Sequence, residues 1–242
     1  MKFFYLVMFI SFCGFPVAAA EMDPLLQGLL TFQTTLAPEL KTVFTLTALS
    51  FIPVFFIAAT SFTRIIIVLS LLRHALGLQQ TPPNIVLITL ALFLTFFTME
   101  PVFHQVKSAA IMPYQAETIT LPQAISEAVT PFKTFMISQT REQDFLAIAK
   151  MSENPLPANA EDVTLTQLIP AFMLSELTTA FKMAFVIFIP FLLIDLVVAS
   201  VLMALGMMMV PPITVSLPLK IMLFVLIDGW ALITQSLVSS FQ

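Results

Sequence analysis

The stretch Gly206-Met207-Met208-Met209-Val210-Pro211-Pro212 joins two apolar runs. Proline has no backbone N–H and disfavours a helical residue before it, so the proline pair ends any helix that reaches it. We therefore predict a turn between two apolar helices. Methionine is unbranched and polarizable, so three in succession give a soft surface that adapts to irregular partners. The same residues could instead fill gaps at a buried helix end, and the pattern alone leaves this alternative open.

The composition indicates a membrane-associated protein. The 242 residues are 59% hydrophobic and 10% charged, with 25 Phe against 5 Gly, which lies outside the usual range of soluble proteins. With 10 Lys and Arg and a net charge of -4, we expect no nucleic-acid partner.

Residues 1–20 have the layout of a secretory signal peptide. An apolar core from Phe3 to Phe15 precedes three alanines, and we expect cleavage after Ala20. The single cysteine, Cys13, lies inside this segment, so the mature chain would hold neither a disulfide nor a thiolate site.

Hydropathy predicts an all-α fold of membrane-type helical hairpins, with four apolar segments and a soluble, mostly helical insert. Within them we expect a kink or helix junction near Pro53 and a break near Pro190. The predicted segments are a signal peptide (1–20), a polar N-terminal segment (21–42), a first hydrophobic hairpin (43–103), an extracytoplasmic soluble segment (104–167), and a second hairpin with the methionine loop (168–242).

One pattern occurs twice. Ala-Leu-Gly at residues 75–77 and again at 204–206 is followed at the same spacing by Pro-Pro and then Val. The match suggests two related hairpins, although Gly followed by Pro-Pro is also a common way to end a helix. We take the turn-defining residues to be Gly77, Pro82, Pro83, Gly206, Pro211 and Pro212. The linkers differ, being polar in the first copy and methionine-rich in the second, which indicates different roles for the two turns.

Seven charged residues lie in or at the ends of apolar runs, where an ionised side chain costs several kcal/mol without a partner or water. We expect most to form contacts between helices or subunits, with a proton relay as the alternative. The residues are Arg64, Glu100, Glu176, Lys182, Asp195, Lys220 and Asp228.

The sequence shows no catalytic pattern. His74 and His104 lack metal-ligand spacing, and neither a nucleophile elbow nor a phosphate loop is present. We expect no enzyme activity, no metal and no cofactor.

Several longer motifs stand in a fixed order along the chain: residues 61–69 with Arg73, residues 79–84, 171–177 and 194–196, the methionine run, and residues 216–220 and 228–230. From about residue 43 to the C-terminus, these motifs resemble those of the FliP family of flagellar type III export-gate proteins. Virulence-system relatives share much of this pattern, but the signal peptide and the Pro211-Pro212 pair look more flagellar.

The resemblance implies a non-enzymatic core subunit of the export channel, through which unfolded flagellar substrates pass. It implies a pentamer assembled with FliQ and FliR, beside other export-apparatus membrane proteins and membrane lipid. The location would be the bacterial inner membrane within the flagellar basal body, with much of the assembly raised toward the periplasm. Met207, Met208 and Met209 would form a ring that closes the pore, and Glu176 and Lys220 would meet at subunit contacts.

Two rival functions remain. An ion or solute transporter would use Asp195 and Glu100 as relay carboxylates, and acid-to-amide replacement would abolish its transport. A purely structural scaffold would tolerate replacement of the methionine run.

Overall fold

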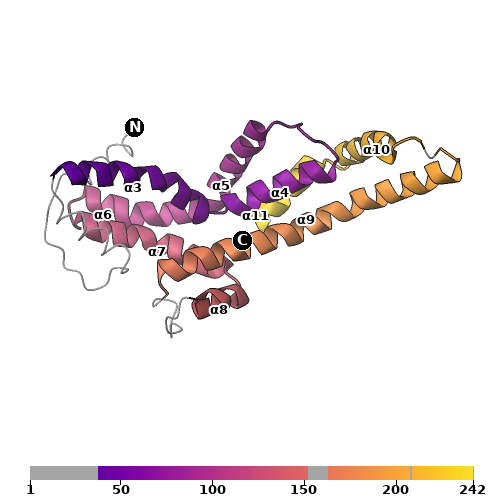
Figure 1. The fold of residues 1–242 in the computed structure, drawn as a ribbon. Helices are drawn as coiled ribbons and strands as arrows, with labels where there is room; N and C mark the ends of the chain where they lie inside the picture. Colours follow the sequence, from indigo (N-terminus) through magenta and orange to yellow (C-terminus); the bar gives the residue numbers. More distant parts are fainter. Residues whose placement is uncertain (1–37, 152–162, 208, 242) are drawn as a thin grey trace. The chain divides into compact units, whose positions relative to one another are not determined.

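The computed structural model describes residues 38–151, 163–207 and 209–241 (Figure 1). Every regular element in these ranges is a helix, which confirms the predicted all-α class. The predicted signal peptide and nearly all of the polar N-terminal segment lie outside the described residues, as does Met208.

The chain forms two compact units. Unit 1 comprises the chain up to residue 60 and residues 100–174, and unit 2 comprises residues 61–99 and 175–242. Helices α5 (Asn84–Val106) and α9 (Leu165–Ala204) contribute to both units. Unit 1 also contains α3 (Pro38–Ala58), the π-helix η1 (Lys107–Ile111), α6 (Met112–Gln115), α7 (Leu121–Gln139) and α8 (Glu142–Met151). Unit 2 also contains α4 (Phe62–Ala75), α10 (Pro212–Leu226) and α11 (Gly229–Ser239). The segment boundaries drawn from hydropathy remain predictions.

In unit 1, α7 begins at a capping box, in which the Thr120 N–H donates to Gln123 Oε1 at 2.9 Å. Buried Met136 of α7 packs with Leu168 and Phe172 of α9. The Phe172 ring meets the edge of Phe135 with ring centroids 6.0 Å apart. These contacts join α7 to the first turns of α9.

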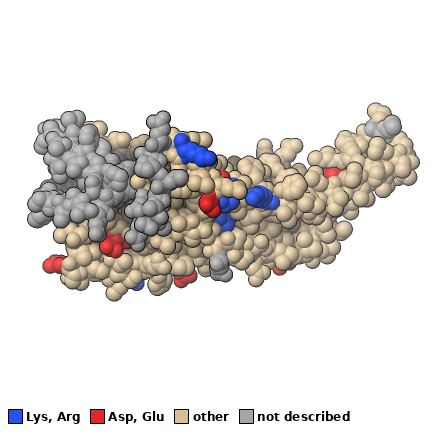
Figure 2. Space-filling model, turned by 90° about the horizontal axis from the view of Figure 1, so that it is seen from below, with Lys and Arg blue, Asp and Glu red and all other residues tan. Residues whose placement is uncertain are grey.

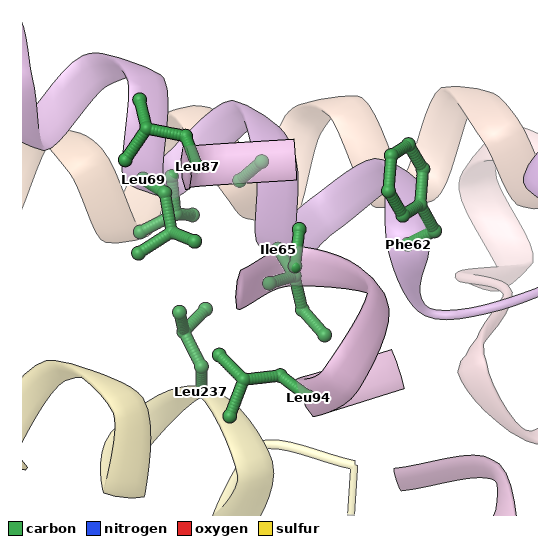
Figure 3. Packing of buried hydrophobic residues seen from close by; sticks show 9 residues of the cluster. Phe62, Ile65, Leu69, Leu87, Leu94 and Leu237 are labelled. Atoms are coloured by element: carbon green, nitrogen blue, oxygen red, sulfur yellow. The ribbon is translucent and has the colours of Figure 1, made fainter. Parts of the chain in front are cut away.

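The core of unit 2 gathers four helices (Figure 3). Phe62, Ile65 and Leu69 recur every three or four residues and therefore lie on one face of α4. They pack against α5, α9 and α11, and each fully buried side chain contributes about 1.5–3 kcal/mol. Their partners in the cluster include Leu87, Leu94, Ala180 and Leu237.

Two continuous helical stretches in the described residues are long and apolar enough to cross a membrane. They are Asn84–Gln115 with 32 residues and Leu165–Ala204 with 40. Helices α10 and α11 together would make a third span, bent by 64°. The four predicted apolar segments correspond to α3 with α4, α5, α9, and α10 with α11. Charged side chains are few and scattered on the face shown in Figure 2, as in a membrane-type helical protein.

The predictions made at two prolines have different outcomes. Helix α9 continues through Pro190, where we expected a break. A proline inside a helix costs about 3 kcal/mol, which a 40-residue apolar helix tolerates because the helical turns on both sides remain bonded. Pro53 lies inside α3, so the helix junction is not at this proline but at residues 59–61, and a kink at Pro53 stays a prediction. There the Thr60 hydroxyl donates to the Phe56 carbonyl at 2.8 Å, and hydroxyls of this kind compete with the backbone ladder.

Candidate functional site

The two Ala-Leu-Gly copies end their helices with the same backbone hydrogen bonds. After α4, the Gly77 N–H donates to the His74 carbonyl at 2.9 Å, and the Leu78 N–H donates to the Arg73 carbonyl at 3.2 Å. Gly77 has φ +81°, a left-handed conformation that glycine adopts at little cost. This arrangement is a Schellman motif.

After α9 the geometry repeats. The Gly206 N–H donates to the Met203 carbonyl and the Met207 N–H to the Leu202 carbonyl, both at 3.0 Å, and Gly206 has φ +71°. The repeated sequence therefore corresponds to a repeated helix end. Either a duplicated hairpin or a common way of ending a helix would give this result.

The proline pairs precede the next helices. Pro211 is the N-cap of α10 and Pro212 its first residue, a position where the missing N–H is harmless. In the first copy, α5 begins directly after Pro83, and Arg73 holds the loop. The Arg73 guanidinium donates to the Pro82 carbonyl at 3.2 Å and to Asn84 Oδ1 at 2.7 Å.

The two turns differ in their surroundings. In the first, Leu76 is 2% exposed, and a side chain at Gly77 would touch Leu217 of α10. In the second, Leu205 is 68% exposed, and no described atom lies within 4 Å of the position that a side chain at residue 206 would take. The methionine turn therefore stands free of the rest of unit 2.

Met207 and Met209 are exposed, by 44% and 97% of their surface. Neither fills a gap in the core of this chain, so the alternative of a buried helix end does not hold for these two residues. Met208, the third member of the predicted gate, lies outside the described residues.

Arg64 of α4 forms the first of two charge contacts between helices. Its Nε donates to Glu176 Oε2 on α9 at 2.8 Å, and its Nη2 pairs with Glu176 Oε1. Its Nη1 donates to both the carbonyl and the hydroxyl of Ser240 at 3.1 Å, at the end of α11. The Phe241 ring lies against the guanidinium, 3.8 Å from its carbon to the ring centroid. One arginine thus joins three helices.

Lys220 of α10 forms the second contact. Its Nζ donates to Asp195 Oδ2 on α9 at 2.7 Å and to the Ala75 carbonyl at 3.3 Å. Ala75 is the last residue of α4, where a cation also interacts favourably with the helix dipole. Lys220 is buried, whereas the Asp195 side chain is 39% exposed. This cation also joins three helices.

The other predicted charges lie at the surface. Glu100, Lys182 and Asp228 are exposed, and no ion pair of theirs occurs among the described residues. Asp228 has φ +52° at the bend between α10 and α11. The next residue, Gly229, leaves no room for a side chain because the Phe224 ring occupies that space.

Glu176 and Lys220 each have a partner inside the chain, and they do not pair with each other there. Because each side chain already has a partner of opposite charge within the chain, burial alone does not require Glu176 and Lys220 to pair. Their meeting between copies stays a prediction from family resemblance.

Sequence reasoning missed the contacts made by Ser240, Phe241, Leu217 and the Ala75 carbonyl. Three are ordinary apolar or hydroxyl residues, and the fourth is a backbone group, so their types carried no signal.

What the arrangement offers chemically is helix cross-linking and an exposed thioether surface. Within the described ranges, no group of His, Cys, Asp and Glu could hold a metal ion.

These features define an all-helical, membrane-type protein with ion pairs between helices and an exposed methionine turn. A sequence model of the FliP family matches residues 45–237. The chain belongs to the FliP family.

Similar proteins carry the name flagellar biosynthetic protein FliP. The one from Pectobacterium carotovorum is 54% identical, with 84% of this chain and 79% of the relative covered. The Bacillus subtilis protein is 50% identical, with 83% and 91% covered. The Aquifex aeolicus protein is 46% identical, with 86% and 87% covered.

Proposed function

We propose that this chain is a subunit of the flagellar type III export channel, and that its methionine turn closes the pore. Membership of the FliP family and the flagellar relatives support the role in export. The chain would act without catalysis, as a pentamer assembled with FliQ and FliR beside other export-apparatus proteins. Its place would be the inner membrane and the periplasmic side of the flagellar basal body.

The observation that carries the gate is the exposure of Met207 and Met209 at the end of the α9–α10 hairpin. A pore for unfolded chains must admit any side chain, yet exclude ions and water when idle. Thioether side chains from several copies could repack around a passing chain and close behind it. Gly206 and the proline pair fix the turn without using the methionine side chains.

The buried charges fit a channel better than a carrier. A relay carboxylate must exchange protons with a path across the protein. Asp195 instead accepts a 2.7 Å hydrogen bond from Lys220, and Glu176 is held by Arg64. Both carboxylates therefore connect helices.

The test is to replace Met207, Met208 and Met209 together by Ala and to measure leakage of ions or small dyes into cells. We expect leakage with normal amounts of complex, because the lost volume lies at the narrowest point. The matched control replaces Met203 and Met222 by Ala, since both are exposed methionines outside the turn. The control should not leak.

Two results would overturn the gate. Normal impermeability with normal complex levels would favour a scaffold. Failure of the complex to accumulate would indicate a buried packing role in the assembly, where each Met→Ala change costs about 2–5 kcal/mol.

A further inference from the structure

The methionine turn is carried by an arm, which we define as residues 196–219 without the undescribed Met208. Asp195 and Lys220 mark its base. From these residues the two helices extend about 14 Å and 12 Å at 1.5 Å per residue. In Figure 1 the loop between α9 and α10 lies at the far end of this hairpin, beyond the end of α4. The arm is largely exposed, with its apolar residues at the surface including Leu196, Val197, Val201, Met203, Ile213 and Val215.

The base of the arm rests on the other Ala-Leu-Gly turn. A side chain at Gly77 would lie 3.4 Å from Leu217 Cδ1, an ordinary contact distance, so the turn and Leu217 are neighbours. One helical turn further along α10, Lys220 donates to the Ala75 carbonyl and pairs with Asp195. Leu217 and Lys220 are three residues apart and so share a face of α10.

We propose that the first turn, Ala75–Gly77, is the support that fixes the position of the methionine arm, with Leu217 and Lys220 as the positioning residues. The support combines the close approach of Leu217 to the turn, an ion pair and a cation at a helix end, all at the base of the arm. Among the described residues, none makes a contact of this kind at Gly206. The packed copy of the motif would thus hold in place the hairpin that carries the exposed copy. The consequence for gating rests on the proposed function, whereas the support itself does not.

Hydrogen–deuterium exchange of the detergent-purified complex tests the support. Leu217→Ala removes the apolar contact, and Lys220→Met removes the charge while keeping a chain of similar length. In both variants we expect several-fold faster exchange at residues 205–216 and also at residues 75–80, on a different helix end. Leu219→Ala is the matched control, because Leu219 is exposed on the same helix and loses the same atoms. It should exchange like the natural protein.

Local helix propensity cannot produce the expected result. Alanine is a better helix former than leucine, so propensity alone would slow exchange near residue 217. Unchanged exchange in both variants would overturn the proposal. An equally large acceleration of exchange in the Leu219→Ala control would also overturn it. Should Leu217→Ala fail to accumulate, Leu217→Val makes a smaller change at the same contact and is judged by the same peptides.

Ion leakage measured on the same variants separates the two proposals. Faster exchange together with leakage is the result expected if the Ala75–Gly77 turn positions the arm and the methionine turn closes the pore. Faster exchange without leakage agrees with the positioning role of the Ala75–Gly77 turn but counts against the methionine turn as the gate. Unchanged exchange rejects the support even if the triple methionine variant leaks.

Discussion

Glu176 is fully buried and meets its counter-charge within its own chain, because the Arg64 guanidinium pairs with both of its carboxylate oxygens. Arg64 is 3% exposed, so water can replace neither partner. The pair joins α4 to α9 across 112 residues of sequence, and Ser240 and Phe241 complete the surroundings of the guanidinium.

Removing one member of this pair should be costly. Arg64→Met leaves the Glu176 carboxylate buried without its counter-charge, which typically lowers the free energy of unfolding by about 3–5 kcal/mol. Changing Glu176 to Leu as well should recover most of the loss, because two apolar side chains then pack against each other. Thermal unfolding of the detergent-purified protein measures both effects.

The pair of Arg141 and Asp144 provides a comparison, because the Arg141 side chain is 31% exposed although that of Asp144 is only 12% exposed. Arg141→Ala should lower the free energy of unfolding less than Arg64→Met does, because water can reach the site of the removed guanidinium. The opposite outcome is a double variant, Arg64→Met with Glu176→Leu, that is no more stable than Arg64→Met alone. That result would show that the unpaired charge does not cause the loss of unfolding free energy.

A charge swap tests whether Glu176 and Lys220 meet between copies. Glu176→Lys places a second cation beside Arg64, and Lys220→Glu places a second anion beside Asp195. The double swap puts like charges at both intrachain contacts but keeps residues 176 and 220 opposite in charge. If the two residues meet between copies, it should recover part of the assembly that Glu176→Lys alone loses. The amount of purified complex is the readout, and no recovery would argue that the two residues are not partners.

The apolar runs predicted the helices because hydropathy and the helical period depend on nearby residues. The choice among ionic partners could not be predicted in this way. An apolar setting tells us that Glu176 needs a cation, but Arg64, Lys182 and Lys220 all qualified by type. The selection depends on the register between α4, α9 and α10. Packing of Ile65 and Leu69 against Ala180 sets the register of α4 on α9. Packing of Phe224 with Leu72 and Phe191 sets that of α10.

The two turns also show that contacts between distant residues could not be predicted from the sequence. Gly followed by Pro-Pro predicted both helix ends, and the hydrogen bonds at Gly77 and Gly206 match those predictions. Nothing in the two Ala-Leu-Gly copies indicated that Leu76 would be buried and Leu205 exposed. That difference comes from packing between residues far apart in sequence, because Leu76 lies in a cluster with Phe191 of α9 and Phe224 of α10.

Two glycines should differ sharply in their tolerance of alanine. Gly206→Ala adds a side chain in open space and pays mainly for its positive φ, about 1 kcal/mol. Gly229→Ala would overlap the Phe224 ring, which is itself held against Phe191 and Trp230. Overpacking of this kind costs about 1–3 kcal/mol or more. Thermal unfolding should therefore show a larger loss for Gly229→Ala, and Phe224→Leu in the same chain should relieve part of it. Equal losses at both glycines would contradict this assignment.

Acid-to-amide replacement separates a channel from a carrier. Glu100 is exposed on α5 without an ion pair among the described residues, so Glu100→Gln removes no helix contact that the structure shows. If the chain forms a passive channel, the Glu100→Gln variant should assemble and export flagellar subunits at the normal rate.

Asp195→Asn should instead weaken the base of the methionine arm, because Lys220 is buried and loses its counter-charge. A relay of the two carboxylates requires the opposite pattern, in which both variants assemble normally and both stop transport. Export rate and complex amount, measured together for each variant, distinguish these outcomes, since only a relay gives intact complex with no transport at Glu100.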